Sequence, residues 1–334
     1  MALAYLGLSG VNTNKEIIRI VTVAVVVVGA GVVGCSVSQE SASPEPTTDN
    51  IPYYFIAIHN EPYHFPGGEI KLAEEYETLR RMIAKANLSD IKLTLMFTAQ
   101  WADYISESSE RMAELESWKN QGHEIAAHHH SIYHGNWDGY TDYSREQAEA
   151  QRMEQGFEPE EYLGTFEDYI NKLRILNPDI KSGCTNEEHD KKEMPDAIVY
   201  GTCSGFANCG EVGGRLSDTD PRKGRNEYIL TGSVNGILRK WLTHYQITTP
   251  ARQKSAQTVF SSLNSSYVYG VVTHSASGVQ EEEYYNFLEF LHSEDLEGNK
   301  SRTVSEIIEQ GLVPERTIST DLLNEKFTPI VTRR

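Results

Sequence analysis

The sequence predicts an α/β fold in which helices cover a largely parallel sheet, and three observations support this prediction. From residue 51 onward, strand-like and helix-like hydrophobic patterns alternate along the chain, which is typical of parallel sheets. This part of the sequence contains no internal repeat and no linker-like stretch, so we expect one domain. Several predicted strands are followed directly by polar residues, many of them histidines, and α/β barrels place their chemistry at such strand ends.

Seven segments are predicted to form strands, because they are short, apolar and bounded by polar or turn-forming residues. The first three and the last carry the clearest pattern, and the other three are weaker. The predicted strands are residues 53–59, 91–97, 123–129, 180–185, 197–203, 228–233 and 267–274.

Six segments are predicted to form helices between most of these strands. In the first of them, Leu72, Tyr76 and Leu79 recur at three- and four-residue spacing, which places them on one face of a helix. Gly122 and Pro178 follow two others and are residues that commonly terminate helices. The predicted helices are residues 69–87, 106–121, 159–176, 250–263, 280–292 and 303–310.

The composition indicates a globular protein that does not bind nucleic acid. The 334 residues are 39% hydrophobic, which suits one large domain or two modest ones. The formal net charge is −18 at pH 7, whereas a nucleic-acid partner would require a basic surface. This charge favours solubility and carries no information about the fold.

The N-terminal segment, residues 1–35, predicts an export signal rather than part of the globular domain. Its apolar run, residues 20–34, is short for a membrane span but suits the apolar core of a signal peptide. The run ends at Cys35 in a pattern that resembles a lipobox, whose cysteine is lipidated after cleavage. Residues 36–50, rich in Ser, Thr, Pro and acidic residues, indicate a flexible linker. We therefore expect a lipoprotein on the outer face of the cytoplasmic membrane, or alternatively an uncleaved N-terminal membrane anchor.

Three further cysteines lie beyond the linker, and all three fall within the predicted domain, residues 51–313. In an exported protein two of them could form a disulfide, and the odd number leaves one free. Their spacing matches no zinc-binding pattern, and the sequence does not decide which two would pair. These cysteines are Cys184, Cys203 and Cys209. An irregular tail, residues 314–334, is expected after the domain.

Four histidines cluster at the end of the third predicted strand: His128, His129, His130 and His134. Packing alone does not explain so many imidazoles, and neutral imidazole is a common ligand of zinc and similar ions. His130 and His134 are four residues apart, so a helical turn would place both on one side. Because His128 and His129 alternate in direction along a strand, we expect one of them to face away and to be structural.

Other predicted strand ends bring further candidates to the same edge of the sheet. His59 and Glu61 close the first strand, and His274 closes the last. His59 and Glu61 alternate onto the same side of an extended chain, so either could complete an ion site with the histidine cluster. A catalytic zinc usually has three protein ligands and an open position for water.

Three residues after the histidine cluster are candidates for substrate binding: Trp137, Asp138 and Tyr140. Aromatic rings offer a flat apolar surface on which a sugar can stack. The alternative interpretation is a tight loop without a binding role.

On these motifs the chain resembles the polysaccharide deacetylase (NodB-like) family. That family carries a His-Ser/Thr-x-x-His metal motif soon after a Gly-His-Glu-Ile strand. Here residues 122–125 are Gly-His-Glu-Ile and residues 130–134 are His-Ser-Ile-Tyr-His. The family's last strand ends in a histidine that assists catalysis, as His274 ends the last strand here. The resemblance covers most of residues 51–312 and implies a distorted (β/α)7 barrel.

The resemblance also implies a metal-dependent enzyme that removes acetyl groups from a carbohydrate, with zinc as the first candidate for the divalent ion. One of His59 and Glu61 would accept a proton from the attacking water, and His274 would protonate the leaving group. The partners implied are an acetylated glycan as substrate and a membrane through the N-terminal lipid or anchor. The predicted metal ligands are His128, His130, His134 and Glu61.

Two departures from the family pattern leave alternatives open. The family's first motif, Thr-Phe-Asp-Asp-Gly-Pro, supplies a base and a ligand, but here the aligned residues 59–62 are His-Asn-Glu-Pro. In addition, His128 rather than His130 occupies the position of the family's first histidine, and residues 186–190 stand where its Arg-Pro motif would. The alternatives are a non-catalytic glycan-binding lipoprotein on the same fold, or a metal hydrolase acting on another C–N or ester bond.

Overall fold

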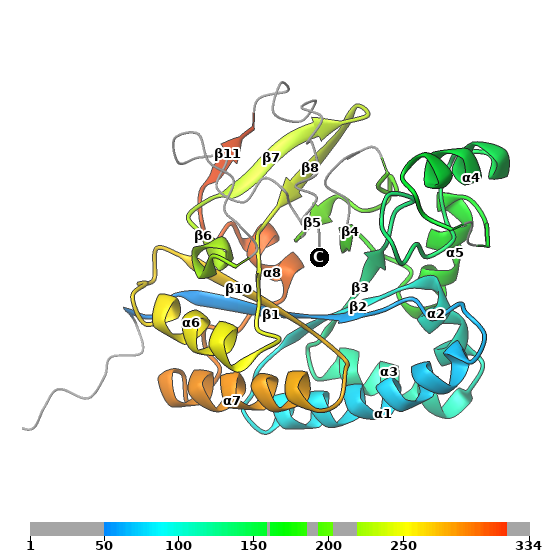
Figure 1. Ribbon diagram of the computed structural model, residues 1–334. Coiled ribbons are helices and arrows are strands. Elements are labelled where there is room, and N and C mark those ends of the chain that lie inside the picture. Colours follow the sequence, from blue (N-terminus) through cyan, green and yellow to red (C-terminus); the bar gives the residue numbers. More distant parts are fainter. Residues whose placement is uncertain (1–49, 159–160, 186–192, 203–218, 319–334) are drawn as a thin grey trace, which may run out of the picture. The chain divides into compact units, whose positions relative to one another are not determined.

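Figure 1 shows a computed structural model of the chain. The described residues belong to the compact unit Pro46–Arg334, whereas the unit Met1–Glu45 lies outside them. The predicted lipidation site Cys35, the cysteines Cys203 and Cys209, and most of the predicted C-terminal tail also lie outside the described part. Within it, no helix is long and apolar enough to cross a bilayer. The described residues are 50–158, 161–185, 193–202 and 219–318.

Each predicted strand and each predicted helix overlaps an element of the structure, and α5 is the helix that is most shortened. The strands are β1 (Tyr53–Asn60), β2 (Leu93–Phe97), β3 (Glu124–His129), β4 (Ser182–Thr185), β5 (Tyr200–Gly201), β6 (Arg225–Asn226), β7 (Ile229–Val234), β8 (Ile237–Trp241), β9 (Tyr245–Gln246), β10 (Val268–His274) and β11 (Glu315–Thr317). The helices are α1 (Gly68–Asn87), α2 (Ala99–Ser106), α3 (Ser109–Asn120), α4 (Arg145–Glu154), α5 (Phe166–Leu176), the 3-10 helix η2 (Pro221–Gly224), α6 (Pro250–Phe260), α7 (Val279–Glu294) and α8 (Val304–Gln310).

The sheet confirms the predicted α/β class. Seven strands pair in parallel in the order β8-β5-β4-β3-β2-β1-β10. At the margins β7 pairs with β8 and β6 pairs with β10, both antiparallel. No pairing among the described strands joins the two ends of this order, so the sheet is an open, distorted form of the predicted seven-unit barrel (Figure 1).

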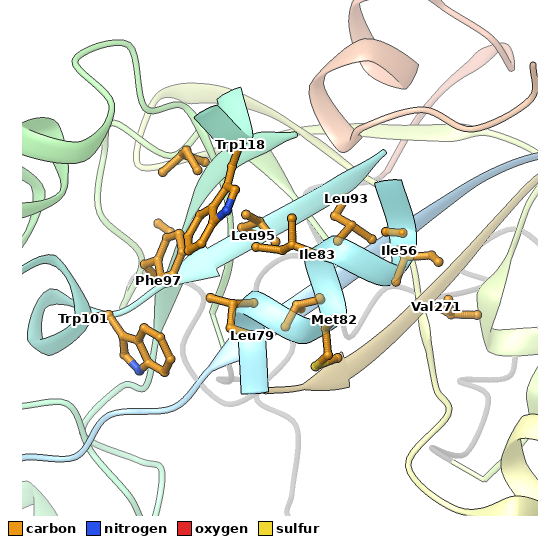
Figure 2. Packing of buried hydrophobic residues seen from close by; sticks show 14 of the residues in the cluster. Ile56, Leu79, Met82, Ile83, Leu93, Leu95, Phe97, Trp101, Trp118 and Val271 are labelled. Atoms are coloured by element: carbon orange, nitrogen blue, oxygen red, sulfur yellow. The ribbon is translucent and has the colours of Figure 1, made fainter. Parts of the chain in front are cut away.

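Alternation of side chains along β1 separates the two faces of the sheet. Ile56 and Ile58 join a large apolar cluster with α1, α2, α3, α5, α6 and α7, which defines the outer face. Figure 2 shows part of this packing, with Ile56 close to apolar side chains of α1 and β2. Phe55 and Ala57 point the other way and pack with α8, which defines the inner face. Full burial of such a side chain stabilises the fold by about 1.5–3 kcal/mol.

Strand register determines which side chains meet at the carboxyl edge of the sheet. His59 on β1 is paired with His274 on β10, and His128 on β3 is paired with Cys184 on β4. All four continue the alternation of inner-face residues on their own strands. The inner face therefore ends, on three separate strands, in an imidazole.

Helix α4 and strand β8 were not predicted from the sequence. Ser144 and Gln147 form a capping box that starts α4, which stabilises the first turn although the helix has little apolar periodicity. Strands β7 and β8 form a hairpin whose turn residues Asn235 and Gly236 have φ angles of 53° and 81°. A two-residue turn of this kind requires positive φ at both positions, which Asn-Gly adopts readily.

Candidate metal centre

Imidazoles and one carboxylate converge at the carboxyl edge of the inner face. Glu61 directly follows β1, and its carboxylate lies near the side chains of His128, His130 and His274. His59, from β1 itself, stacks on His128 with ring centroids 4.1 Å apart. The structure thus brings together the predicted site residues from β1, β3 and β10, although nothing in it establishes their chemical roles.

Three of these side chains have the spacing that a single metal ion requires. His128 Nε2 lies 3.4 Å from Glu61 Oε1, and His130 Nε2 lies 3.4 Å from Glu61 Oε2. The two Nε2 atoms are 3.0 Å apart. A tetrahedral zinc ion with bonds of about 2.0–2.1 Å holds its ligand atoms about 3.3–3.4 Å apart. Glu61, His128 and His130, hereafter the ligand triad, therefore fit one ion and leave one position open.

The hydrogen bond at the far side of the His130 ring supports this fit. His130 Nδ1 lies 2.7 Å from the carbonyl oxygen of Asn136. A carbonyl only accepts, so Nδ1 carries the hydrogen and the Nε2 atom of the neutral ring keeps its lone pair. Metal-binding histidines usually donate their second nitrogen in this way, which fixes the tautomer and the ring direction.

His134 is the half-buried neighbour of His130, with ring centroids 4.1 Å apart. Its Nδ1 accepts a hydrogen bond from the backbone N–H of Asn136 at 3.1 Å. Burial is the main reason that the pKa of His134 lies below its usual value. His134 lies beside His130, but its Nδ1 accepts a hydrogen bond, whereas Nδ1 of His130 donates one.

Glu61 carries the negative charge of the centre. Burial raises its pKa, but the hydrogen bond with His128 and the proximity of His130 and His274 lower it further, so the net pKa lies well below the ordinary value. Its side chain is 22% exposed. An ionised carboxylate surrounded by imidazoles is a suitable ligand for a divalent cation.

His59 is buried deeper on the inner face than Glu61. Burial, together with His128 and His244, lowers the pKa of His59 well below its usual value, so the ring is neutral near pH 7. Its Nε2 is buried and has no hydrogen-bond partner among the described residues. Buried polar atoms are normally paired, so this nitrogen has the capacity to contact a ligand or a water in the centre.

His274 faces the triad from β10. Its Nε2 lies 3.5 Å from Glu61 Oε1, and its Nδ1 lies 2.9 Å from Gln280 Oε1 on α7. The ring is 20% exposed, so it is accessible from the mouth of the centre. Gln280 fixes the orientation of the ring and was not predicted from the sequence, because its place on the first turn of α7 depends on how that helix packs.

In the described part of the chain, two further groups have ligand atoms that all lie within 4.8 Å of one another: His59 with Glu61 and His128, and His59 with Cys184 and His244. The ring of His244 lies 5.3 Å from that of His59. Cys184 is disulfide-bonded, and a disulfide sulfur is not the thiolate that metals prefer. The ligand triad is therefore the better candidate for an ion.

His129 points to the outer face, as alternation along β3 predicts for one of the two neighbouring histidines. Its Nδ1 lies 2.7 Å from Asp138 Oδ2, and its ring packs against Phe166 and Tyr169. Asp138 also accepts hydrogen bonds from the backbone N–H groups of His130 and Tyr140. His129 is thus part of the support of the loop that follows β3.

The positions of Trp137, Asp138 and Tyr140 do not suit the substrate-binding role predicted for them. All three side chains are buried, with exposures of 0%, 0% and 2%. Trp137 packs with Ile132, and its indole N–H donates to the carbonyl of Tyr140. A buried ring has no free face on which a sugar can stack, so the tight-loop interpretation describes these residues better.

A buried arginine on α4 holds the same loop from the other side. Arg152 is 1% exposed, and its Nη1 donates to the carbonyl oxygens of Ile132 at 3.0 Å and His134 at 2.9 Å. Its guanidinium also lies over the rings of Trp137 and Phe157. The sequence contained no signal for this role, because an arginine on a polar helix normally lies in solvent.

Asn60, which stands where the family has a ligand, does not join the centre. Its side-chain amide donates to the carbonyl oxygen of Met96 on β2 at 2.8 Å. The carboxylate that lies beside the histidines is that of Glu61. Residues 186–190, which stand where the family has its Arg-Pro motif, lie outside the described residues.

Neither the protein-family models nor the curated protein sequences match this chain. Solved structures that are similar to it include the 4-alpha-glucanotransferase from Thermococcus litoralis, with 14% identity, a TM-score of 0.49 and coverage of 80% of this chain and 39% of that one. This chain therefore spans well under half of that transferase.

Two proteins assigned as polysaccharide deacetylases are also similar in structure. The one from Pseudomonas aeruginosa PAO1 has 10% identity and a TM-score of 0.46, with coverage of 82% of this chain and 96% of that one. The one from Mycobacterium smegmatis has 11% identity and a TM-score of 0.42, with coverage of 83% and 96%. At these values a likeness does not carry an activity, so the function must be argued from the centre itself.

Proposed function

We propose that this protein is a metal-dependent hydrolase that removes acetyl groups from a carbohydrate. The observation that carries this proposal is the ligand triad, whose three donor atoms lie 3.0 to 3.4 Å apart. The resemblance of residues 122–134 to the metal motif of polysaccharide deacetylases suggests the substrate class. Zinc is the favoured ion, because two imidazoles and one carboxylate are among its usual ligands.

In this proposal Glu61, His128 and His130 would hold the ion. A bound zinc ion would lower the pKa of a coordinated water to about 7 and polarise the acyl carbonyl. His59 offers a buried, neutral Nε2 beside the triad and would accept the proton of the attacking water. His274, oriented by Gln280, would deliver a proton to the leaving amine or alkoxide.

The sequence left open which of His59 and Glu61 is the ligand and which the base, and we assign Glu61 as ligand and His59 as base. Glu61 contacts both triad histidines at 3.4 Å, whereas His59 stacks on His128 and has a ring nitrogen within 4.8 Å of ligand atoms of Glu61 and His128. If Glu61 holds the ion, the neutral ring of His59 is the group left beside the triad to accept the proton.

The proposal is tested with the purified full chain loaded with zinc. We expect about one zinc per chain, together with acetate release from acetylated glycans that stops with a chelator and returns on addition of zinc. Bound zinc without acetate release from a broad panel of acetylated sugars would favour the alternative of a non-catalytic glycan-binding protein. Release of other products from amide or ester substrates would favour a hydrolase of a different bond.

We also propose that the protein is exported and held at the outer face of the membrane through Cys35, which rests on the sequence of residues 20–35. The disulfide at Cys184 supports an oxidising compartment. Cells that express Cys35→Ser should release the protein from the membrane fraction, whereas wild type should stay there and incorporate a labelled fatty acid. An unchanged distribution of the variant would contradict lipidation at this residue.

A further inference from the structure

We propose that His134 is not a metal ligand but a hydrogen-bond donor that presents its Nε2–H to an acceptor oxygen of the substrate. This inference rests on the proposed function for the identity of the substrate. The assignment of His134 as a non-ligand stands on geometry alone and is tested separately.

The first observation is the hydrogen bond that His134 receives. A backbone N–H can only donate, so the 3.1 Å contact from Asn136 N makes His134 Nδ1 an acceptor. In a neutral imidazole the other nitrogen then carries the hydrogen. His134 Nε2 is therefore an N–H group and has no lone pair for an ion.

The second observation is the contrast with His130, which is bonded to the same residue in the opposite sense. Asn136 accepts from His130 Nδ1 through its carbonyl and donates to His134 Nδ1 through its N–H. One residue thus selects opposite tautomers for two neighbouring imidazoles. His130 receives the tautomer of a ligand, and His134 receives that of a donor.

The third observation is the position of Glu61 relative to the histidines. Among the described residues, three histidines have a ring nitrogen within 3.5 Å of a Glu61 carboxylate oxygen, namely His128, His130 and His274. The carboxylate of Glu61 therefore contacts the two triad histidines and His274, and no such contact to His134 is found among the described residues.

Two hydrogen bonds made by the backbone of His134 hold its loop in place. Arg152 donates to the carbonyl oxygen of His134, and the backbone N–H of His134 donates to the carbonyl oxygen of Ser131 at 2.9 Å. To reach the ion, His134 would have to give up its bond with Asn136. The fixed donor lies next to His130 and is half-buried, which suits a group that stabilises negative charge developing on a substrate oxygen.

Metal binding separates the ligand and non-ligand assignments. We expect His134→Ala to bind zinc with the stoichiometry and affinity of wild type, and His130→Ala to lose binding at least tenfold. In the zinc-loaded, ¹⁵N-labelled protein, the imidazole spectrum of His134 should show hydrogen on Nε2. A loss of zinc in His134→Ala equal to that in His130→Ala, or a His134 spectrum with Nε2 bound to zinc, would overturn the proposal.

Two matched variants test the donor role. A glutamine side chain can place an N–H near the position of Nε2, whereas an asparagine side chain reaches only the position of Nδ1. We expect acetate release to fall about 100-fold in His134→Ala and His134→Asn, and to recover at least tenfold in His134→Gln, all with normal zinc content. Full activity in His134→Ala would overturn the donor role. If wild type released no acetate, the deacetylase proposal would fail, while the zinc and spectroscopic results would still decide the ligand assignment.

Discussion

Both ends of β3 carry polar side chains, but the two ends differ in how completely these side chains are hydrogen-bonded. At the start of the strand the carboxylate of Glu124 accepts hydrogen bonds from Thr94 at 3.1 Å, from Ser182 at 2.5 Å, and from both the backbone N–H and the hydroxyl of Ser305. At its end, His128 has a buried Nδ1 without a partner in the described part of the chain.

His123, which immediately precedes β3, is as well satisfied as Glu124. The backbone N–H of Leu93 donates to its Nδ1 at 3.0 Å, and its Nε2 lies 3.0 Å from Asn87 Oδ1. The polar side chains at the beginning of the strand therefore form a fully hydrogen-bonded network that supports folding. At its end, one buried ring nitrogen of His128 has no hydrogen-bond partner among the described residues. The difference shows that residue type alone does not indicate a site. A buried polar atom without a hydrogen-bond partner is the more informative sign.

Removal of the triad carboxylate should have the largest effect. We expect Glu61→Gln to weaken zinc binding more than about 100-fold, because changes outside the ligand shell already cost 10–100-fold. Isothermal titration of the metal-free protein with zinc measures this change. Wild-type zinc affinity in the variant would show that the ion, if any, is bound elsewhere.

The two buried arginines offer a matched comparison between the centre and the rest of the fold. Arg152 supports the loop of His134, while Arg239, also 1% exposed, donates to the carbonyls of Pro195 and Ile198. Arg239 also donates to the carbonyl of Met194, so loss of either arginine leaves at least two carbonyls without their donor, at about 1–3 kcal/mol each.

We expect Arg152→Met and Arg239→Met to lose similar free energies of unfolding, about 2–5 kcal/mol. Only Arg152→Met should also bind zinc about 10–100-fold more weakly. Urea unfolding of the metal-free proteins and zinc titration give the two quantities. Equal zinc affinities in the two variants would mean that Arg152 contributes to stability alone, and Arg152→Lys provides a milder change if the methionine variant does not fold.

Acid should destabilise the start of β3 through His123. Burial lowers the pKa of His123 to about 4 from an unfolded value of 6.5, so between these values the unfolded chain binds more protons. Stability is therefore fully present above pH 6.5 and decreases by up to about 3 kcal/mol as the pH falls towards 4.

The comparison of wild type with His123→Asn isolates this effect, because the buried histidines of the centre change stability in the same direction. Urea unfolding with chelator at pH 7 and pH 4.5 should show a smaller loss for the variant than for wild type. Parallel losses in the two proteins would contradict the assignment to His123.

The smallest effect is expected for Glu124→Gln. The amide keeps one acceptor oxygen but opposes donors with its NH₂ group, so we expect a loss of about 1–2 kcal/mol in the free energy of unfolding. Zinc binding should not change, since Glu124 is at the opposite end of the strand from the triad. A clear change in zinc affinity would contradict the view that the start of β3 supports only the fold and that its end supports metal binding.

The fold could be predicted where hydrophobic periodicity and strand-end residues agree. The pattern of β1, β2, β3 and β10 was clear, and parallel pairing then brought His59, His128 and His274 to one edge. Helix α4 could not be found in this way, because its buried residues are only Ala148 and Arg152. Strand β8 had an Asn-Gly turn before it, which is a usable hairpin signal.

The identity of the site residues was predicted better than their bonding. Which nitrogen of His130 or His134 carries hydrogen depends on the loop backbone at Asn136, which no residue pattern encodes. The aromatic residue Trp137 fitted both a binding surface and a packed loop, and only its burial distinguishes the two. The residue pattern therefore predicts which side chains gather at the centre, but not the hydrogen bonds between them.

The place of the triad in the sheet has a mechanical consequence. Glu61 and His128 are 67 positions apart in the sequence, and they extend from β1 and β3, which do not pair with each other because β2 lies between them. A captured cation would act as a clip across the intervening strand and would favour the assembled sheet by mass action, by about 2.7 kcal/mol at a concentration one hundred times Kd. The concentration of the ion would then affect the stability of the folded protein as well as its activity.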